Sequence, residues 1–227
     1  MPDVVRERRG LPPLENGDLL TRAEFHRRYV HDAGVKKAQL IEGVVYMPSP
    51  VGVTHGSSHV DLATWLGTYR AYTPGVMAID NTTVILDPDN EPQPDLAMRI
   101  ERGGTSSVDD KGYVVGAPEL AIEIAGSSAS IDLRDKLNAY RRTGVKEYIV
   151  WRTYDEAIDV FVHTGEDLRR IELPTDGIYK GIYRSIAFPG LWLNVQALLK
   201  RDLAGVLTTL NAGIADESHA AFVKSLG

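Results

Sequence analysis

The sequence predicts a mixed α/β (α+β) fold, in which a mixed central sheet is flanked by helices and carries extra β-hairpins. Helical patterns alternate along the chain with short apolar runs of strand length, and pairs of these runs enclose short turns. The chain has 227 residues, of which 43% are hydrophobic, so it can bury a sizeable core. We expect an N-terminal arm at 1–18, one main domain at 19–200 and a C-terminal helical tail at 201–227.

The first expected elements are a short helix, a tight hairpin and a longer helix. Thr21 and Glu24 have capping-box spacing, which predicts a helix that ends near Gly34. Apolar runs on both sides of a Glu-Gly pair predict a hairpin over 38–47. Apolar residues recur at helical spacing over 55–72 and predict the second helix. Its expected buried residues are Val60, Ala63, Leu66 and Tyr69, with Trp65 alongside.

Strand patterns dominate the rest of the chain, and one helix interrupts them. The expected strands are 76–79, 83–86, 96–100, 120–125, 149–151, 157–162, 168–173 and 185–188, with a Gly/Ser-rich loop at 102–111. Ser130 is the expected N-cap of the helix and Gly144 its C′ residue. The buried stripe of that helix is expected to be Leu133, Leu137 and Tyr140. Residues 202–227 alternate Ala, Leu and Gly, and we expect them to be either helical or frayed.

Composition excludes several classes of function. The chain has no cysteine, so disulfides, Cys-zinc sites and thiol catalysis are excluded. No apolar run is long enough to span a bilayer and no signal-peptide segment is visible, so we expect a cytoplasmic protein without a membrane partner. A Gly-Lys-Ser/Thr phosphate loop is missing, so no nucleotide cofactor is expected. The formal net charge of −6 argues against a non-specific nucleic-acid coat, although metal-binding carboxylates contribute to that charge.

Two carboxylates and a lysine form the candidate site. Asp95 follows Pro94 at the start of an expected strand, and Glu123 interrupts a strand that otherwise reads as buried. A charge inside a buried strand needs a partner or a metal. Lys136 lies on the next expected helix. Two carboxylates on neighbouring strands, close enough to share one cation beside a lysine, are the minimum equipment for metal-assisted phosphodiester cleavage.

Simpler readings compete with this one at two points. Asp132 and Lys136 are four residues apart on the expected helix, so a surface salt bridge would explain the pair. His55 and His59 share one helix face at the same spacing and could bind zinc. The residues between the two histidines lack the glutamate of a zinc-peptidase helix, so this zinc hypothesis is weak.

Several short motifs occur in a specific order over about residues 19–165. They are Leu40–Gly43, Met47–Pro50, His55, Pro94–Asp95, Glu119–Glu123, Asp132–Tyr140, Gly144–Val145 and Glu147–Trp151. Together they resemble the Uma-type family of restriction endonucleases, a branch of the PD-(D/E)xK nuclease superfamily. The resemblance implies a restriction-endonuclease-like core and Mg²⁺-dependent hydrolysis of DNA.

The resemblance also implies roles for single residues. Asp95 and Glu123 would be the metal carboxylates, with the Ile124 carbonyl as a further ligand, and such hard oxygen donors suit Mg²⁺ or Mn²⁺. The superfamily lysine is replaced by Ala125 here, and Lys136 stands where a lysine on the following helix would take its place. Lys136 would orient the attacking water and offset charge on the phosphate. We therefore expect Lys136→Ala to bind Mn²⁺ normally yet barely cleave DNA.

Two further residues fall on family positions, and a third departs from the family. Glu42 would join the metal shell through water, and His55 would contact the scissile phosphate or the metal. Gln39 stands where the resemblance leads us to expect an acidic residue.

The leading functional hypothesis is a metal-dependent endodeoxyribonuclease with DNA as its substrate. We expect a homodimer, because the hairpins over 38–47 and 157–173 offer strand edges and cutting two DNA strands favours two-fold symmetry. One alternative is a non-catalytic, homo-oligomeric nucleic-acid-binding protein that retains the nuclease fold. Another is a metal phosphoesterase that acts on small substrates.

Overall fold

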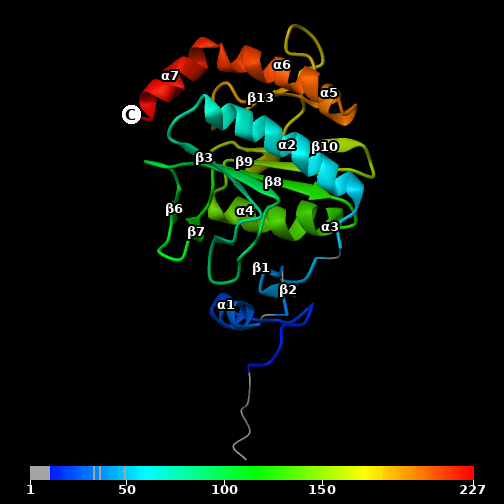
Figure 1. Cartoon of the computed structure of the whole chain (residues 1–227), viewed down its shortest axis with the longest axis vertical. Coiled ribbons are helices and arrows are strands. Elements are labelled where there is room, and N and C mark those ends of the chain that lie inside the picture. The colour runs from blue at the N-terminus through cyan, green and yellow to red at the C-terminus, as the bar shows by residue number, and fades with distance from the viewer. Residues whose placement is uncertain (1–10, 33, 36, 49) are drawn as a thin grey trace, which may run out of the picture.

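A six-stranded sheet forms the centre of the fold in the computed structural model, which describes residues 11–227 except 33, 36 and 49. Residues 1–10, most of the predicted N-terminal arm, lie outside the described residues. The strands run in the order β11-β10-β9-β8-β5-β3 (Figure 1). Their bounds are β3 Val76–Asp80, β5 Leu96–Ile100, β8 Leu120–Ala125, β9 Glu147–Arg152, β10 Ala157–His163 and β11 Leu168–Arg170. Only β8 and β9 pair in parallel within this sheet, so it is mixed, as the sequence predicts.

Side chains of the central strands alternate between two buried layers, because successive residues of a strand point to opposite faces. In β8 the larger core takes Leu120, Ile122 and Ile124, and a second core takes Ala121 and Ala125. Helix α2 (Val53–Ala71) packs on the larger core, and α4 (Leu137–Thr143) packs on the second. Figure 1 shows these two helices on opposite sides of the sheet. Glu123 lies between the two alanines and therefore points to the side of α4.

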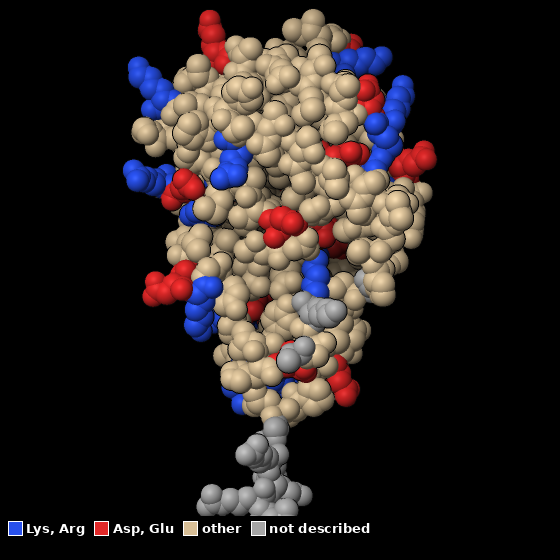
Figure 2. All heavy atoms as spheres, viewed as in Figure 1, with Lys and Arg blue, Asp and Glu red and all other residues tan. Residues whose placement is uncertain are grey.

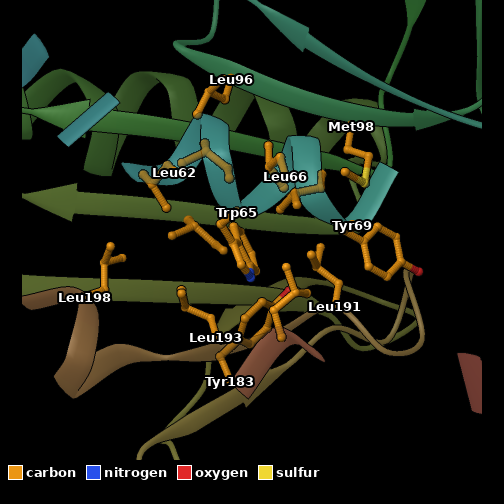
Figure 3. Packing of buried hydrophobic residues seen from close by; sticks show 14 of the residues in the cluster. Leu62, Trp65, Leu66, Tyr69, Leu96, Met98, Tyr183, Leu191, Leu193 and Leu198 are labelled. Atoms are coloured by element: carbon orange, nitrogen blue, oxygen red, sulfur yellow. The ribbon is translucent and has the colours of Figure 1, made fainter. Parts of the chain in front are cut away.

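Helix α2 supplies the largest side chains of the main core. Figure 3 shows Leu62, Trp65, Leu66 and Tyr69 projecting from it into the cluster. The indole N–H of Trp65 donates a hydrogen bond of 2.9 Å to the carbonyl of Trp192, which satisfies its buried polar atom. Val60, predicted to be buried, is exposed, because the buried stripe of α2 starts at Leu62.

The C-terminal segment is helical and packs against the main core. It contains α5 (Val195–Leu199), α6 (Leu203–Ile214) and α7 (Glu217–Ser225). Val206 and Leu210 of α6 are fully buried in the main core. No helix in the described part of the chain has the length and apolar character needed to cross a membrane.

The N-terminal segment forms a small layer at one end of the molecule (Figure 1). It comprises α1 (Arg22–His31) and the predicted hairpin of β1 (Gln39–Ile41) and β2 (Val44–Tyr46). The Thr21 hydroxyl accepts the backbone N–H of Glu24 at 3.4 Å, which is one half of the predicted capping box. Both residues of the hairpin turn, Glu42 and Gly43, have positive φ, as a tight two-residue hairpin requires.

Three local predictions are wrong. The loop at 102–111 contains β6 (Ser106–Val108), which joins β4 (Val84–Ile85) and β7 (Val114–Gly116) in a small sheet. Residues 185–188 form no strand, and instead connect β12 (Ile182–Arg184) to β13 (Trp192–Asn194). Ser130 is no N-cap, because helix α3 (Ala129–Ile131) already begins before it, and a π-helical turn (Asp132–Lys136) leads from α3 into α4.

Candidate active site

The two carboxylates predicted to act together come from adjacent strands. Leu96 of β5 pairs with Ile122 of β8, so Asp95, just before Leu96, stands opposite Glu123, just after Ile122. Directly opposed residues of antiparallel strands share one face of the sheet. Asp95 is 7% exposed and Glu123 is 3% exposed. The backbone N–H of Ile124 donates to Oδ2 of Asp95 at 2.8 Å, which joins the two strands at this point.

Lys136 reaches the site from the π-helical turn and lies in the buried interior. Its Nζ is 2.9 Å from Oε2 of Glu123 and 3.2 Å from Oδ1 of Asp132. The predicted pair of Asp132 and Lys136 therefore exists, but the surface reading of it is wrong, because both residues are buried. A π-helical turn adds a residue to one helical turn and often occurs at functional sites. Here that turn carries both charged residues to the side of the helix that faces Glu123.

Hydroxyl groups complete the buried cluster. The Tyr140 hydroxyl donates to Oε1 of Glu123 at 3.2 Å, and the Ser128 hydroxyl donates to Oδ2 of Asp132 at 2.7 Å. Tyr140 was predicted only as a core residue of its helix, and its polar role follows from the position of Glu123.

Asp95 is the carboxylate nearest to solvent, and two partly exposed cationic groups face it. Nε2 of His55, from the first turn of α2, is 3.4 Å from Oδ2. Nζ of Lys37, from the segment before β1, is 3.7 Å from Oδ1. Sequence reasoning missed Lys37, because it lies in an irregular segment with no periodic pattern, and only the folded chain brings it to Asp95.

The charges of the cluster are unbalanced, and the pKa values reflect this. Burial raises the pKa of Glu123 to about 8, and the charges of Asp132 and Asp95 add to this effect although Lys136 opposes it. For Asp95, burial is outweighed by the His55 contact, the Ile124 N–H and Lys37, so its pKa is lowered. Burial alone would lower the pKa of Lys136, but Glu123 and Asp132 raise it above its ordinary value. Three buried carboxylates around one lysine therefore leave room for additional positive charge.

The donor set suits a divalent cation in charge and in chemistry. Carboxylates of Asp95 and Glu123 and the carbonyl of Ile124 are hard oxygen donors of the kind Mg²⁺ and Mn²⁺ prefer. Within residues 11–227, apart from 33, 36 and 49, no group of three or more His, Asp or Glu side chains is arranged as a ready metal site. The two carboxylates are instead bound to Lys136, His55 and Lys37. A cation would therefore share or replace these contacts.

Glu42 does not join this cluster in the structure. Its carboxylate lies 2.9 Å from the guanidinium of Arg142, on α4, and both side chains are substantially exposed. Among the contacts of the described residues, none joins Glu42 to Asp95 or Glu123. Its proposed water-mediated role remains a prediction.

Gln39 and His59 occupy structural positions around the site. Oε1 of the buried Gln39 accepts the backbone N–H of Gln93 at 3.4 Å. Nε2 of His59 is 2.9 Å from Asp80 and 3.1 Å from the backbone carbonyl of Asp95. The two histidines of the zinc hypothesis thus turn to different aspartates, because Nε2 of His55 faces the Asp95 side chain.

Comparisons with known proteins agree with the fold and the motifs. A family model described as Uma2, "Putative restriction endonuclease", matches residues 22–196, so the chain belongs to this family. A crystal structure from Anabaena variabilis, described as "a putative nuclease belonging to DUF820", superposes with a TM-score of 0.58. The two chains are 15% identical, and the match covers 80% of this chain and 98% of the other. No curated protein matches the chain. The resemblance inferred from the motifs and the predicted fold class are therefore confirmed.

Proposed function

We propose that this protein is a metal-dependent endodeoxyribonuclease that hydrolyses phosphodiester bonds of DNA. Membership of the family and the shared fold support a nuclease. The observation that carries the finer proposal is the buried cluster of Asp95, Glu123 and Asp132 around Lys136, whose negative charge exceeds its positive charge. Such a cluster is costly to bury unless it serves to hold a cation.

The residues of the site divide the work. Asp95, Glu123 and the carbonyl of Ile124 would hold Mg²⁺ or Mn²⁺, which when bound would activate a water and stabilise charge on the phosphate. Lys136 fixes the orientation of Glu123 by a direct contact of 2.9 Å. His55 stands at the solvent edge of the site, 24% exposed, where its imidazole can donate a hydrogen bond to a phosphate oxygen.

Surface charge bears on how DNA would bind. On the face in Figure 2, acidic and basic side chains are interspersed and do not form one continuous basic surface. With a formal net charge of −6, long-range attraction of DNA is expected to be weak. We therefore expect binding to depend on short-range contacts at the site, and to weaken steeply as salt rises.

Supercoiled plasmid DNA with Mn²⁺ tests the proposal directly. The parent protein should convert the plasmid to nicked and linear forms, and Glu123→Ala should leave it supercoiled, because that variant loses a metal carboxylate. A thermal melt checks that the variant is folded, and EDTA should abolish cleavage by the parent. Equal cleavage by parent and variant would refute the site. Binding without cleavage would favour the non-catalytic nucleic-acid-binding alternative.

The homodimer is a second expectation. The outer edges of β11 and β3 have no strand partner in the described part of the chain, and unpaired edges are places where a second chain can add. The hairpin of β1 and β2 is less open than the sequence suggested, since Leu19 bridges Val44 and Leu40 bridges Glu91. Sedimentation at micromolar concentration should report twice the chain mass of 25.0 kDa. A single 25.0 kDa species would contradict the prediction.

A further inference from the structure

The site contains two kinds of positive charge that differ in their access to solvent. The Lys136 side chain is 4% exposed, and its ammonium is held by carboxylates at 2.9 Å and 3.2 Å. The Lys37 side chain is 32% exposed, and its ammonium is 3.7 Å from Asp95, beyond the range of a good hydrogen bond. A phosphate that approaches from solvent therefore meets Lys37 before it meets Lys136.

Lys37 is held in place, although its contact with Asp95 is long. Its Nζ donates to Oδ1 of Asn81 at 2.5 Å. Asn81 is itself fixed, because its backbone N–H donates to the carbonyl of Asp95 at 3.2 Å and its φ is +46°, in the left-handed region that asparagine tolerates. The side chain is therefore ordered next to Asp95, and a phosphate contact would cost little additional side-chain entropy.

The ammonium of Lys37 also has unused binding capacity. A lysine carries three N–H donors, and the hydrogen bond to Asn81 uses one of them. The contact with Asp95 is too long to engage a second donor firmly. A phosphate oxygen can thus accept a charge-assisted hydrogen bond from Lys37 without displacing Asn81.

We propose that Lys37 is a substrate-binding residue that contacts the phosphate of the DNA strand lying at Asp95. In this arrangement Lys136 organises the buried carboxylates, and Lys37 is the cation that faces the substrate. The inference rests on the proposed nuclease function, because it names a contact of that same site with DNA. A merely structural lysine would tie the segment before β1 to Asp95 and would not affect DNA.

The salt dependence of binding to a short DNA duplex, measured with Ca²⁺ and without Mn²⁺, separates these roles. Each phosphate contact adds about one unit to the slope of log affinity against log salt. Lys37→Ala and Lys37→Gln should therefore reduce the slope by about one relative to the parent. Lys37→Arg should keep it, because the charge remains. Lys224→Ala, at an exposed lysine on α7, serves as the matched control and should not change it.

Plasmid cleavage in Mn²⁺ provides the second measurement. Lys37→Ala should cleave roughly tenfold to a hundredfold more slowly than the parent, a loss in the range of one missing transition-state or phosphate donor. A parental slope and a parental rate in both neutral variants would overturn the role of Lys37 and leave the nuclease proposal standing. If the parent itself does not cleave, the nuclease proposal fails, and the slope still decides whether Lys37 contacts phosphate. If the parent binds no duplex, the phosphate contact is refuted as well.

Discussion

Lys136→Ala is expected to lower DNA cleavage by roughly a hundredfold or more, in line with the loss of one transition-state donor. The substitution is also expected to reduce the free energy of unfolding by about 3–5 kcal/mol, because it leaves buried carboxylates without their cation. Glu123 and Asp132 both lie within 3.2 Å of this ammonium. Mn²⁺ binding should persist, since lysine is not a metal ligand. Denaturant unfolding, plasmid cleavage and Mn²⁺ titration measure the three quantities.

Arg142→Ala is the matched control for the stability change. Arg142 also pairs with a carboxylate at 2.9 Å, but its side chain is 49% exposed. Loss of an exposed pair of this kind should change stability by no more than about 1 kcal/mol. Equal effects of the two substitutions would contradict the argument from burial. If Lys136→Ala unfolds easily yet cleaves at the parental rate when folded, Lys136 has a structural role only.

Sequence patterns predicted the sheet best where both faces of a strand are covered. Strand β8 has the predicted bounds, because a continuous apolar run is stable only between two buried layers. The same pattern made Glu123 conspicuous, since a charge in such a run needs a partner. The opposition of Asp95 and Glu123 then follows from the antiparallel pairing of β5 and β8.

Features that depend on contacts between distant segments were not predictable in this way. Lys37 has no pattern of its own and reaches Asp95 only through the folded position of the segment before β1. Strand β6 exists because β7 pairs with it, and its own residues are mostly polar. The burial of Lys136 depends on a π-helical turn, whereas regular helical spacing places this residue at the edge of the apolar stripe.

The affinity of the protein for Mn²⁺ is expected to rise strongly between pH 6 and pH 8. Burial raises the pKa of Glu123 to about 8, so a proton occupies this carboxylate at lower pH and competes with the cation. Affinity should therefore be lowest at acidic pH, increase as pH approaches the pKa of Glu123 and level off above it. If one proton is displaced for each Mn²⁺, the affinity at pH 8 should exceed that at pH 6 by roughly fifty-fold.

Calorimetric titration of Mn²⁺ in two buffers with different heats of ionisation measures this proton release. At pH 6 about one proton should be released for each bound Mn²⁺, and fewer at pH 8. Glu123→Gln is the matched control, because it keeps the size of the side chain and removes the titrating group. Its Mn²⁺ affinity should be weak and should lose most of the pH dependence. An equally steep pH dependence in this variant would show that another group near Asp95, such as His55, is the one that competes with the cation.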